Sequence, residues 1–254
     1  NPMSTCSQKV RLVLAEKKIE FESVVLDLQS GAQFDPGYLK LNPQAVVPTL
    51  IHEARSVTES TLINEYLEDC YPEPSLLPNT AIERYQMRAF CKQLDEVLHP
   101  ACAVITYAIG ARPGLLAKPK AEVDALINNI PDEARRTHRA MVIKEGIHAP
   151  IFTTALAQYL QILGRAEARL AQTPYLAGEQ ISLADYGLAP YLLRLEHLAL
   201  DTVTDRYPGV KGWYHRIQQR ASYQIAITNW LPKAAVAGFK AAGKAVIAEI
   251  RFPE

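Results

Sequence analysis

The sequence predicts a small α/β domain followed by a larger all-helical domain. Helix and strand signals alternate over roughly the first 70 residues. The stretch YPEPSLLP at 71–78 then ends this pattern, because proline cannot continue a helix and stiffens the chain. Beyond it strand signals nearly vanish and helical spacing dominates. We therefore expect an α/β unit over residues 1–72, a linker over 73–78 and a helical unit over 79–254.

The α/β unit divides into short elements. A helical run follows the opening residues and ends near Lys17. FESVVLDL at 21–28 is rich in β-branched residues and predicts a strand. Pro36 can start a short helix over 36–41, since proline is favoured at the first helical position. Residues 48–60 predict two short strands around a turn, and 61–70 return to helical spacing.

The helical unit shows one clear helix start and one interruption. In ISLADYG, Ser182 and Asp185 have the spacing of a capping box, which is a folding device and not a catalytic one. Residues 109–149 resemble an insertion that carries one or two shorter helices. Long helices are expected at roughly 80–108, 150–172, 183–198, 208–220 and 233–250.

Composition narrows the class of partner. Lys plus Arg and Asp plus Glu each number 27, so the chain has no net charge and no long basic run. Nucleic acid and acidic membrane surfaces are therefore poor partners. The stretch of about 20 apolar residues that spans a bilayer is missing, and no signal peptide is visible.

The cysteines and histidines indicate no metal and no disulfide scaffold. The six histidines lack ligand spacing such as H-E-x-x-H, and the four cysteines form no CxxC pair. A reduced, cytoplasmic setting is therefore expected. Cys70, Cys91 and Cys102 lie in helical runs, where we expect them to be buried in the core.

Three motifs carry a resemblance to a known family. They are STCSQKVRLVL from Ser4 onward, LNPQAVVPTL at 41–50 and VTESTLINEYLE at 57–68. In this order and spacing they resemble the cytosolic glutathione transferases, and the first motif is most similar to the Ser/Cys-type classes, including zeta. SLADYG and the helical second half also fit. The resemblance covers essentially the whole chain.

The resemblance implies a fold and a function. It implies a thioredoxin-like N-terminal domain, an all-α C-terminal domain and a homodimer. It also implies an enzyme that uses glutathione as cosubstrate, without metal, to attack a small hydrophobic, aromatic electrophile in detoxification or aromatic degradation. A thioredoxin-like sheet begins with a strand that this sequence lacks. We therefore expect further residues before Asn1.

Two of the motifs are expected to bind glutathione. Val47-Pro48 opens a strand, where the family has a cis proline, so Val47 would offer its N–H and C=O to the cysteinyl part. An ordinary edge-strand proline is the alternative. Glu59 and Ser60 precede a helix, whose free N–H groups favour an anion. By resemblance, Glu59 pairs with the ammonium of the γ-glutamyl end, and Ser60 holds its carboxylate.

The opening cluster is expected to activate a thiol. A helix N-terminus favours a thiolate, and a hydroxyl that donates to it adds about 1.5–3 kcal/mol. That lowers the thiol pKa by about one to two units from roughly 8.5. By resemblance Ser4 matches the catalytic serine of zeta-like members, with Thr5 the next hydroxyl. Cys6 is the alternative, since reductive dehalogenases of the family carry a reacting cysteine there.

The electrophile and the reaction stay open at this level. Met3, Tyr107 and Arg112 are candidate pocket residues by position and chemistry. The stretch at 103–114 is similar to the dehalogenases, whereas the insertion is similar to bacterial β-aryl etherases. Conjugation, dehalogenation and ether cleavage are all compatible with the motifs. A non-catalytic binding protein is the rival class, and the intact hydroxyl cluster and Glu-Ser pair favour the enzyme.

Overall fold

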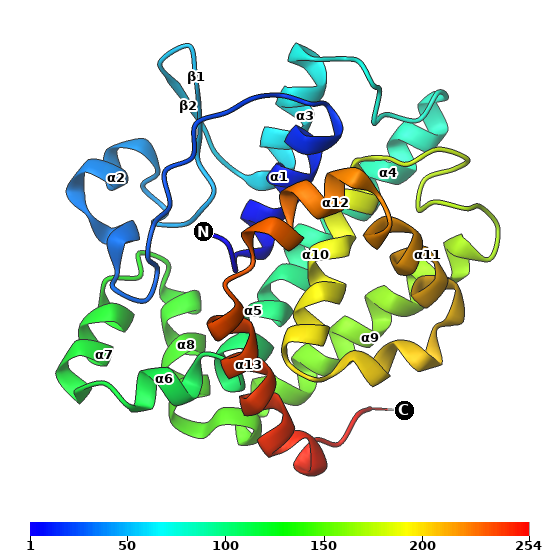
Figure 1. Ribbon diagram of the computed structural model, residues 1–254. Coiled ribbons are helices and arrows are strands. Elements are labelled where there is room, and N and C mark those ends of the chain that lie inside the picture. Colours follow the sequence, from blue (N-terminus) through cyan, green and yellow to red (C-terminus); the bar gives the residue numbers. More distant parts are fainter. Residues whose placement is uncertain (254) are drawn as a thin grey trace.

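The computed structural model describes residues 1–253 and has a small α/β part beside a large helical part (Figure 1). The two predicted strands of residues 48–60 are present and form an antiparallel hairpin. Its turn residues Glu53 and Ala54 both have positive φ, as a tight two-residue hairpin requires. The elements of this part are α1 (Thr5–Glu16), η1 (Ala32–Phe34), α2 (Pro36–Leu41), β1 (Leu50–His52), β2 (Arg55–Val57) and α3 (Ser60–Cys70).

The helical part begins with one continuous rod. The expected helix over 80–108 is present as α4, a π-helical turn η2 and α5, which follow one another without a break. The other long helices are present close to their expected bounds. The elements are α4 (Ala81–Gln93), η2 (Leu94–Leu98), α5 (His99–Ala108), α6 (Arg112–Leu116), α7 (Lys120–Asn128), α8 (Glu133–Glu145), η3 (Gly146–His148), α9 (Pro150–Leu170), α10 (Leu183–His197), η4 (Asp201–Arg206), α11 (Pro208–Gln218), α12 (Ala221–Ala226), η5 (Thr228–Trp230), α13 (Lys233–Val246) and η6 (Ile247–Glu249).

The predicted strand at 21–28 is wrong. This segment runs in extended form, but within residues 1–253 the sheet has only β1 and β2. β-Branched side chains favour extended backbone, whereas a strand also needs a hydrogen-bonded neighbour. The carbonyl of Leu26 accepts only from the side chain of Asn1, at 3.0 Å, and Val24 is 80% exposed.

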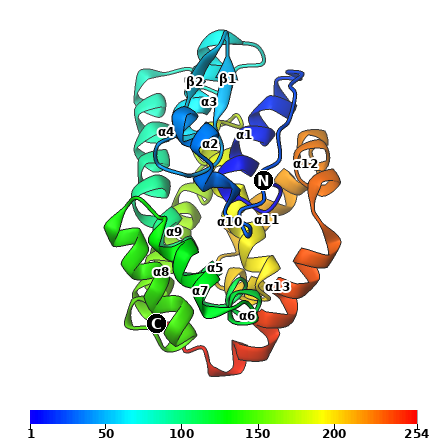
Figure 2. The same cartoon turned by 90° about the vertical axis from the view of Figure 1, so that its left-hand side faces the viewer.

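The insertion at 109–149 holds more helices than expected. It contains three, α6, α7 and α8, where one or two were predicted. Pro113 lies in the first turn of α6 and Pro119 caps α7, so each proline starts a new short helix. Figure 2 shows these helices below the hairpin and α2, and Arg135 of α8 donates to the carbonyl of Gln44 at 2.9 Å.

Helix α1 lies at the centre of the molecule and joins its two parts. It packs against α3 within the α/β part and against α10 and α12 of the helical part (Figures 1 and 2). Its apolar residues Leu12 and Val13 are fully buried. Burial on both sides explains why α1 cannot move relative to α10 without opening the core.

The capping box at the start of α10 is confirmed and extends into a network. The backbone N–H and the hydroxyl of Ser182 both donate to Asp185 Oδ2 at 2.8 Å. The other carboxylate oxygen accepts from Leu176 N at 3.0 Å and from Trp213 Nε1 at 2.8 Å. Asp185 is fully buried, so this one side chain ties α10 to α11 and to the loop before it.

A buried ion pair fastens the end of α1 to the Pro-rich stretch. Lys17 Nζ lies 2.6 Å from Glu68 Oε2, and the two side chains are 0% and 3% exposed. The ammonium also donates to the carbonyls of Tyr71 and Pro74, at 2.7 and 2.8 Å. Glu68 in turn accepts from Leu76 N at 3.1 Å. The chain between the two parts is thus held at several backbone positions.

Candidate active site at the first turn of α1

Ser4 is the N-cap of α1. Its Oγ accepts from the backbone N–H of Ser7 at 3.2 Å, which satisfies one of the free donors of the first turn. The hydroxyl proton of Ser4 is not used by that bond and remains available to a ligand. Thr5 is buried near Tyr191, whose pKa burial raises well above its ordinary value.

Cys6 has the environment of a reactive thiol. Its Sγ lies 3.5 Å from His99 Nδ1, and the residue as a whole is half-buried. Burial raises the pKa of this thiol, but the charges of His99 and Lys9 and hydrogen bonds from His99 and Ser60 lower it more. The net effect brings the pKa of Cys6 from 9.0 to about 6. These neighbours favour the thiolate form of Cys6.

The π-helical turn η2 supplies two charged neighbours of α1. Asp95 lies in this turn, and its Oδ1 is 2.9 Å from the buried Lys9 Nζ. His99 follows directly and donates its backbone N–H to the Leu94 carbonyl, the i→i−5 bond of a π turn. Tyr191 of α10 closes the group, with its hydroxyl 3.3 Å from His99 Nδ1.

The loop before β1 contains a cis proline and a residue whose backbone groups are free. The Val47–Pro48 bond is cis, as predicted. Asn42 and Tyr38 hold the preceding turn by donating to the Val46 carbonyl at 2.9 and 2.5 Å. Within residues 1–253 the N–H and C=O of Val47 have no hydrogen-bond partner, so both can bind a peptide-like ligand.

The start of α3 has no side-chain cap. Glu59 has a φ of 66°, a left-handed conformation that non-glycine residues rarely adopt, and its side chain is exposed. Its side chain does not cap α3, which leaves the N–H groups of the first turn free. Ser60 is buried and faces Cys6. The structure therefore brings the third motif next to the first.

The predicted electrophile residues are spread more widely. The carbonyl of Met3 accepts from the guanidinium of Arg194. The ring of Tyr107 is covered by Arg139, whose Cζ lies 3.0 Å from the ring centroid. Arg112 donates to the carbonyls of Ile143 and Lys144, at 2.9 and 3.1 Å, and so closes the end of α8.

These contacts bear on whether the three residues can also bind an electrophile. Arg112 donates from Nε and Nη2 to backbone, and in the described chain no contact joins it to Cys6 or Ser60. Its role in an electrophile pocket stays a prediction, as do those of Met3 and Tyr107. Arg135 and Arg139 both lie on α8, and Arg139 covers the ring of Tyr107. No pattern in the sequence had pointed to either residue.

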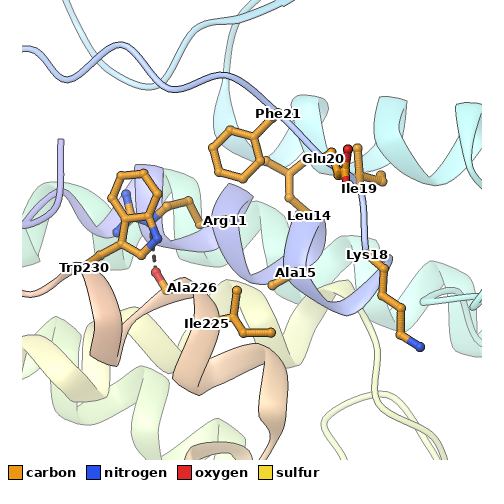
Figure 3. Close-up of a pocket in the computed structure, with 10 residues that line it drawn as sticks. All are labelled: Arg11, Leu14, Ala15, Lys18, Ile19, Glu20, Phe21, Ile225, Ala226 and Trp230. Atoms are coloured by element: carbon orange, nitrogen blue, oxygen red, sulfur yellow. Dashed lines mark hydrogen bonds between the residues drawn. The ribbon is translucent and has the colours of Figure 1, made fainter.

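Two cavities lie away from these residues. One, of about 240 Å³, opens between α1, the segment at 18–21 and Trp230 (Figure 3). In it Arg11 stacks on Trp230 and donates to the Ala226 carbonyl at 2.9 Å. The second, of about 580 Å³, lies between the start of α9 and η6. Neither is lined by the predicted site residues.

The other cysteines separate into two kinds. Cys91 and Cys102 are buried, as expected, and burial raises their pKa values, that of Cys91 to about 12. The expectation for Cys70 is wrong, because it is exposed at the last turn of α3, on the face that turns away from the core. Among residues 1–253 no group of His, Cys, Asp and Glu is placed to hold a metal, and no helix is long and apolar enough to cross a bilayer.

Sequence reasoning missed the partners of Cys6. Lys9 carries little signal of its own, since Gln8 and Arg11 make the same helical run polar around it. His99, Asp95 and Tyr191 carry no signal either. They reach Cys6 only through the packing of η2, α5 and α10 on α1.

A thiol at a helix start, a cis-proline loop and a helical second part define a class of thiol-dependent transferases. Two family models match the chain: Glutathione S-transferase, N-terminal domain, at residues 3–70, and Glutathione S-transferase, C-terminal domain, at 133–221. The chain belongs to the glutathione S-transferase family and is an enzyme of that family, which uses glutathione as cosubstrate.

The relatives cover most of the chain. Protein LigF of Sphingobium sp. is 32% identical over 84% of this chain and 86% of its own length. Glutathione S-transferase 3 of Zea mays is 30% identical over 89% and 90%. The tetrachloro-p-hydroquinone reductive dehalogenase of Sphingobium chlorophenolicum is 28% identical over 90% and 94%.

The solved structures give the same fold. The crystal structure of the β-etherase LigF superposes with a TM-score of 0.79 at 28% identity, covering 87% of this chain and 93% of that one. The family resemblance and the fold class are therefore confirmed: a thioredoxin-like α/β part followed by a helical part.

Proposed function

We propose that the enzyme binds glutathione between the Val47–Pro48 loop and the starts of α1 and α3, and directs its thiolate at a hydrophobic, aromatic electrophile. The observation that carries the proposal is the meeting of two helix starts: α3 packs against α1, so that Ser60 lies close to Cys6. Both helices leave first-turn N–H groups free at this point, one beside the expected carboxylate and one beside the expected thiol.

The free groups fit the parts of glutathione. The unpartnered backbone of Val47 can pair with the cysteinyl peptide unit in the manner of a short strand. The exposed Glu59 carboxylate can take the γ-glutamyl ammonium, and the uncapped start of α3 with Ser60 can take the carboxylate. Pro48 sets the direction of the loop.

Ser4, Thr5 and Cys6 support different chemistry. Ser4 has a spare hydroxyl proton at the helix start and suits thiolate activation, whereas Thr5 is buried. Cys6 suits a reduction in which it exchanges with a glutathionyl sulfur. The lowered pKa of Cys6 and the dehalogenase relative favour glutathione-dependent dehalogenation as a second candidate function. The β-etherase relative supports ether cleavage.

Assembly and setting follow from the same family. We propose a homodimer, because α3 and α4 expose Leu62 and Tyr85, which are 61% and 66% exposed, on helices joined by the Arg88–Glu65 pair. Light scattering of the purified chain tests this, since a dimer has twice the mass of the 28.2 kDa chain. We also propose domain bounds at residues 72 and 79. The four free cysteines in the described chain suggest a cytoplasmic setting.

The deciding experiment measures glutathione consumption against an aryl chloride, a halogenated hydroquinone and a β-aryl ether. A thioether alone indicates conjugation, glutathione disulfide indicates dehalogenation, and a thioether with a released phenol indicates ether cleavage. Glu59→Gln should raise the glutathione KM about tenfold, the cost of one charge-assisted bond. Glu53→Gln, an exposed glutamate in the hairpin turn, should leave it unchanged. Binding of glutathione without consumption of any electrophile would instead indicate a binding protein.

A further inference from the structure

We propose that His99 is a positioning residue that takes the proton of Cys6 and holds the pair as thiolate and imidazolium. The thiol proton moves from Cys6 Sγ to His99 Nδ1, and no other reactant is needed. The use of this thiolate rests on the proposed function, but the ion pair itself is a property of the free protein. The proposal concerns Cys6 alone and leaves the activation of glutathione by Ser4 as a separate step.

The geometry of the ring supports this transfer. Cys6 Sγ lies 3.5 Å from His99 Nδ1 and 3.8 Å from Nε2, so sulfur faces the nitrogen edge of the imidazole. Tyr191 holds that edge in place, with its hydroxyl 3.3 Å from Nδ1 and its ring edge-on to the imidazole, centroids 6.3 Å apart. Tyr191 is fully buried and cannot swing away.

The surrounding charges favour the ionised pair. Lys9 is buried, lies 5.1 Å over the Tyr191 ring and is paired with Asp95 at 2.9 Å. Proton transfer leaves the net charge of the cluster at zero, but it places a thiolate near the Lys9 ammonium and an imidazolium near the Asp95 carboxylate. Ionised Cys6 raises the pKa of His99, burial lowers it, and the net shift is upward. A neutral pair would leave Lys9 facing the uncharged sulfur.

Each helix packed around the pair presents a group to it. Ser60 of α3 lies beside Cys6 and Tyr191 of α10 touches His99, while α1 and η2 supply Lys9 and Asp95. Cys91 and Cys102 lie nearby, and burial raises the pKa of both, so neither competes for the proton. Among the neighbours of Cys6 in residues 1–253, His99 is the one that can accept a proton near neutral pH.

The first test is the pH dependence of alkylation by iodoacetamide. A Cys70→Ala background removes the exposed thiol, and Cys91 and Cys102 are buried, so the rate reports Cys6. The rate should rise with a midpoint near pH 6 and then level off. His99→Gln keeps the size and polarity but not the charge, and should move the midpoint up by about one to two units. The rate at pH 6 then falls about five- to fiftyfold.

His52→Gln is the matched control, because His52 also bonds a tyrosine hydroxyl, that of Tyr66 at 2.7 Å, and packs edge-on to its ring. It should leave the Cys6 profile unchanged. An unchanged midpoint in His99→Gln, or an equal shift in the His52 control, would overturn the proposal.

The second test measures the pKa of His99 instead of that of Cys6, and it does not need His99 to be replaced. In an NMR titration of the folded protein, Cys6→Ser should lower the pKa of the His99 ring, because coupling between two sites is reciprocal. A purely structural histidine would keep its pKa. Neither test uses glutathione, so a chain with the coupled pair but no glutathione turnover would refute only the proposed function.

Discussion

At the scale of single residues, Ser4 has two separable tasks. As the N-cap it accepts the N–H of Ser7, and as a hydroxyl it still has a proton to donate to a bound thiolate. The first task belongs to folding and the second to catalysis. A substitution can keep the helix cap and remove the hydrogen bond to the thiolate, because a carboxylate also caps a helix but has no proton to donate.

Ser4→Ala should lower the free energy of unfolding by about 1 kcal/mol and raise the pKa of enzyme-bound glutathione by about one to two units. Ser4→Asp should keep the stability but not the low pKa. Urea unfolding measures the first effect and thiolate absorbance the second. Glutathione affinity should change little, since Val47, Glu59 and Ser60 hold the peptide.

The comparison with Cys6→Ala decides between the open alternatives. If Ser4 activates glutathione, Cys6→Ala leaves conjugation largely intact. If Cys6 is the working thiol of a reduction, Cys6→Ala stalls turnover and the unaltered enzyme accumulates a mixed disulfide with glutathione. Equal, mild effects of both substitutions would leave Thr5 or a backbone N–H as the activator.

At the scale of elements, the start of α10 shows how one buried carboxylate can organise three segments. Asp185 accepts four hydrogen bonds, two from Ser182 and one each from Leu176 and Trp213. The capping box alone was visible in the sequence. The bonds to Leu176 and Trp213 arise because α11 and the preceding loop pack over the helix start.

Asp185→Ala should therefore cost at least about 3 kcal/mol of unfolding free energy, because it leaves several buried donors unpaired. Thr80→Ala is the control, since Thr80 forms an exposed capping box with Glu83 at the start of α4, and its loss should cost about 1 kcal/mol. Equal costs in urea unfolding would show that the network adds nothing to the cap.

At the scale of the whole molecule, the Lys17–Glu68 pair holds the α/β part to the chain that leads into the helical part. Both charges are buried and their remaining bonds go to backbone of the Pro-rich stretch. Breaking a buried pair from one side leaves an uncompensated charge, which is more costly than removing both charges.

Lys17→Met should destabilise the protein by about 3–5 kcal/mol. Adding Glu68→Gln, which keeps an oxygen for Leu76 N but removes the charge, should recover part of this loss. Lys211→Met breaks the exposed Lys211–Asp205 pair and should change stability by less than about 1 kcal/mol. Thermal unfolding of the unaltered protein, the two single lysine variants and the double variant measures these differences. A double variant less stable than Lys17→Met would contradict this account.

The sequence by itself determined those features whose physics is local. The hairpin at residues 48–60, the proline-started helix at 36–41, the cap of α10 and the three motifs of the family each depend on a few neighbouring residues. Turn conformation, capping and proline geometry act over such short distances, and so they can be identified without the fold. The strand predicted at 21–28 failed because a strand also needs a partner, which local composition does not supply.

The tertiary structure alone decided which groups surround Cys6. His99 is 93 residues away in sequence, and Tyr191 is farther still. They meet because the π turn η2 and the helices α5 and α10 pack on α1, and packing depends on the whole hydrophobic core. The same packing buries Cys91 and Cys102 and leaves Cys70 in solvent, although all three lie in helices. Proton transfer and pKa depend on distances of a few ångströms, which only the packed molecule sets.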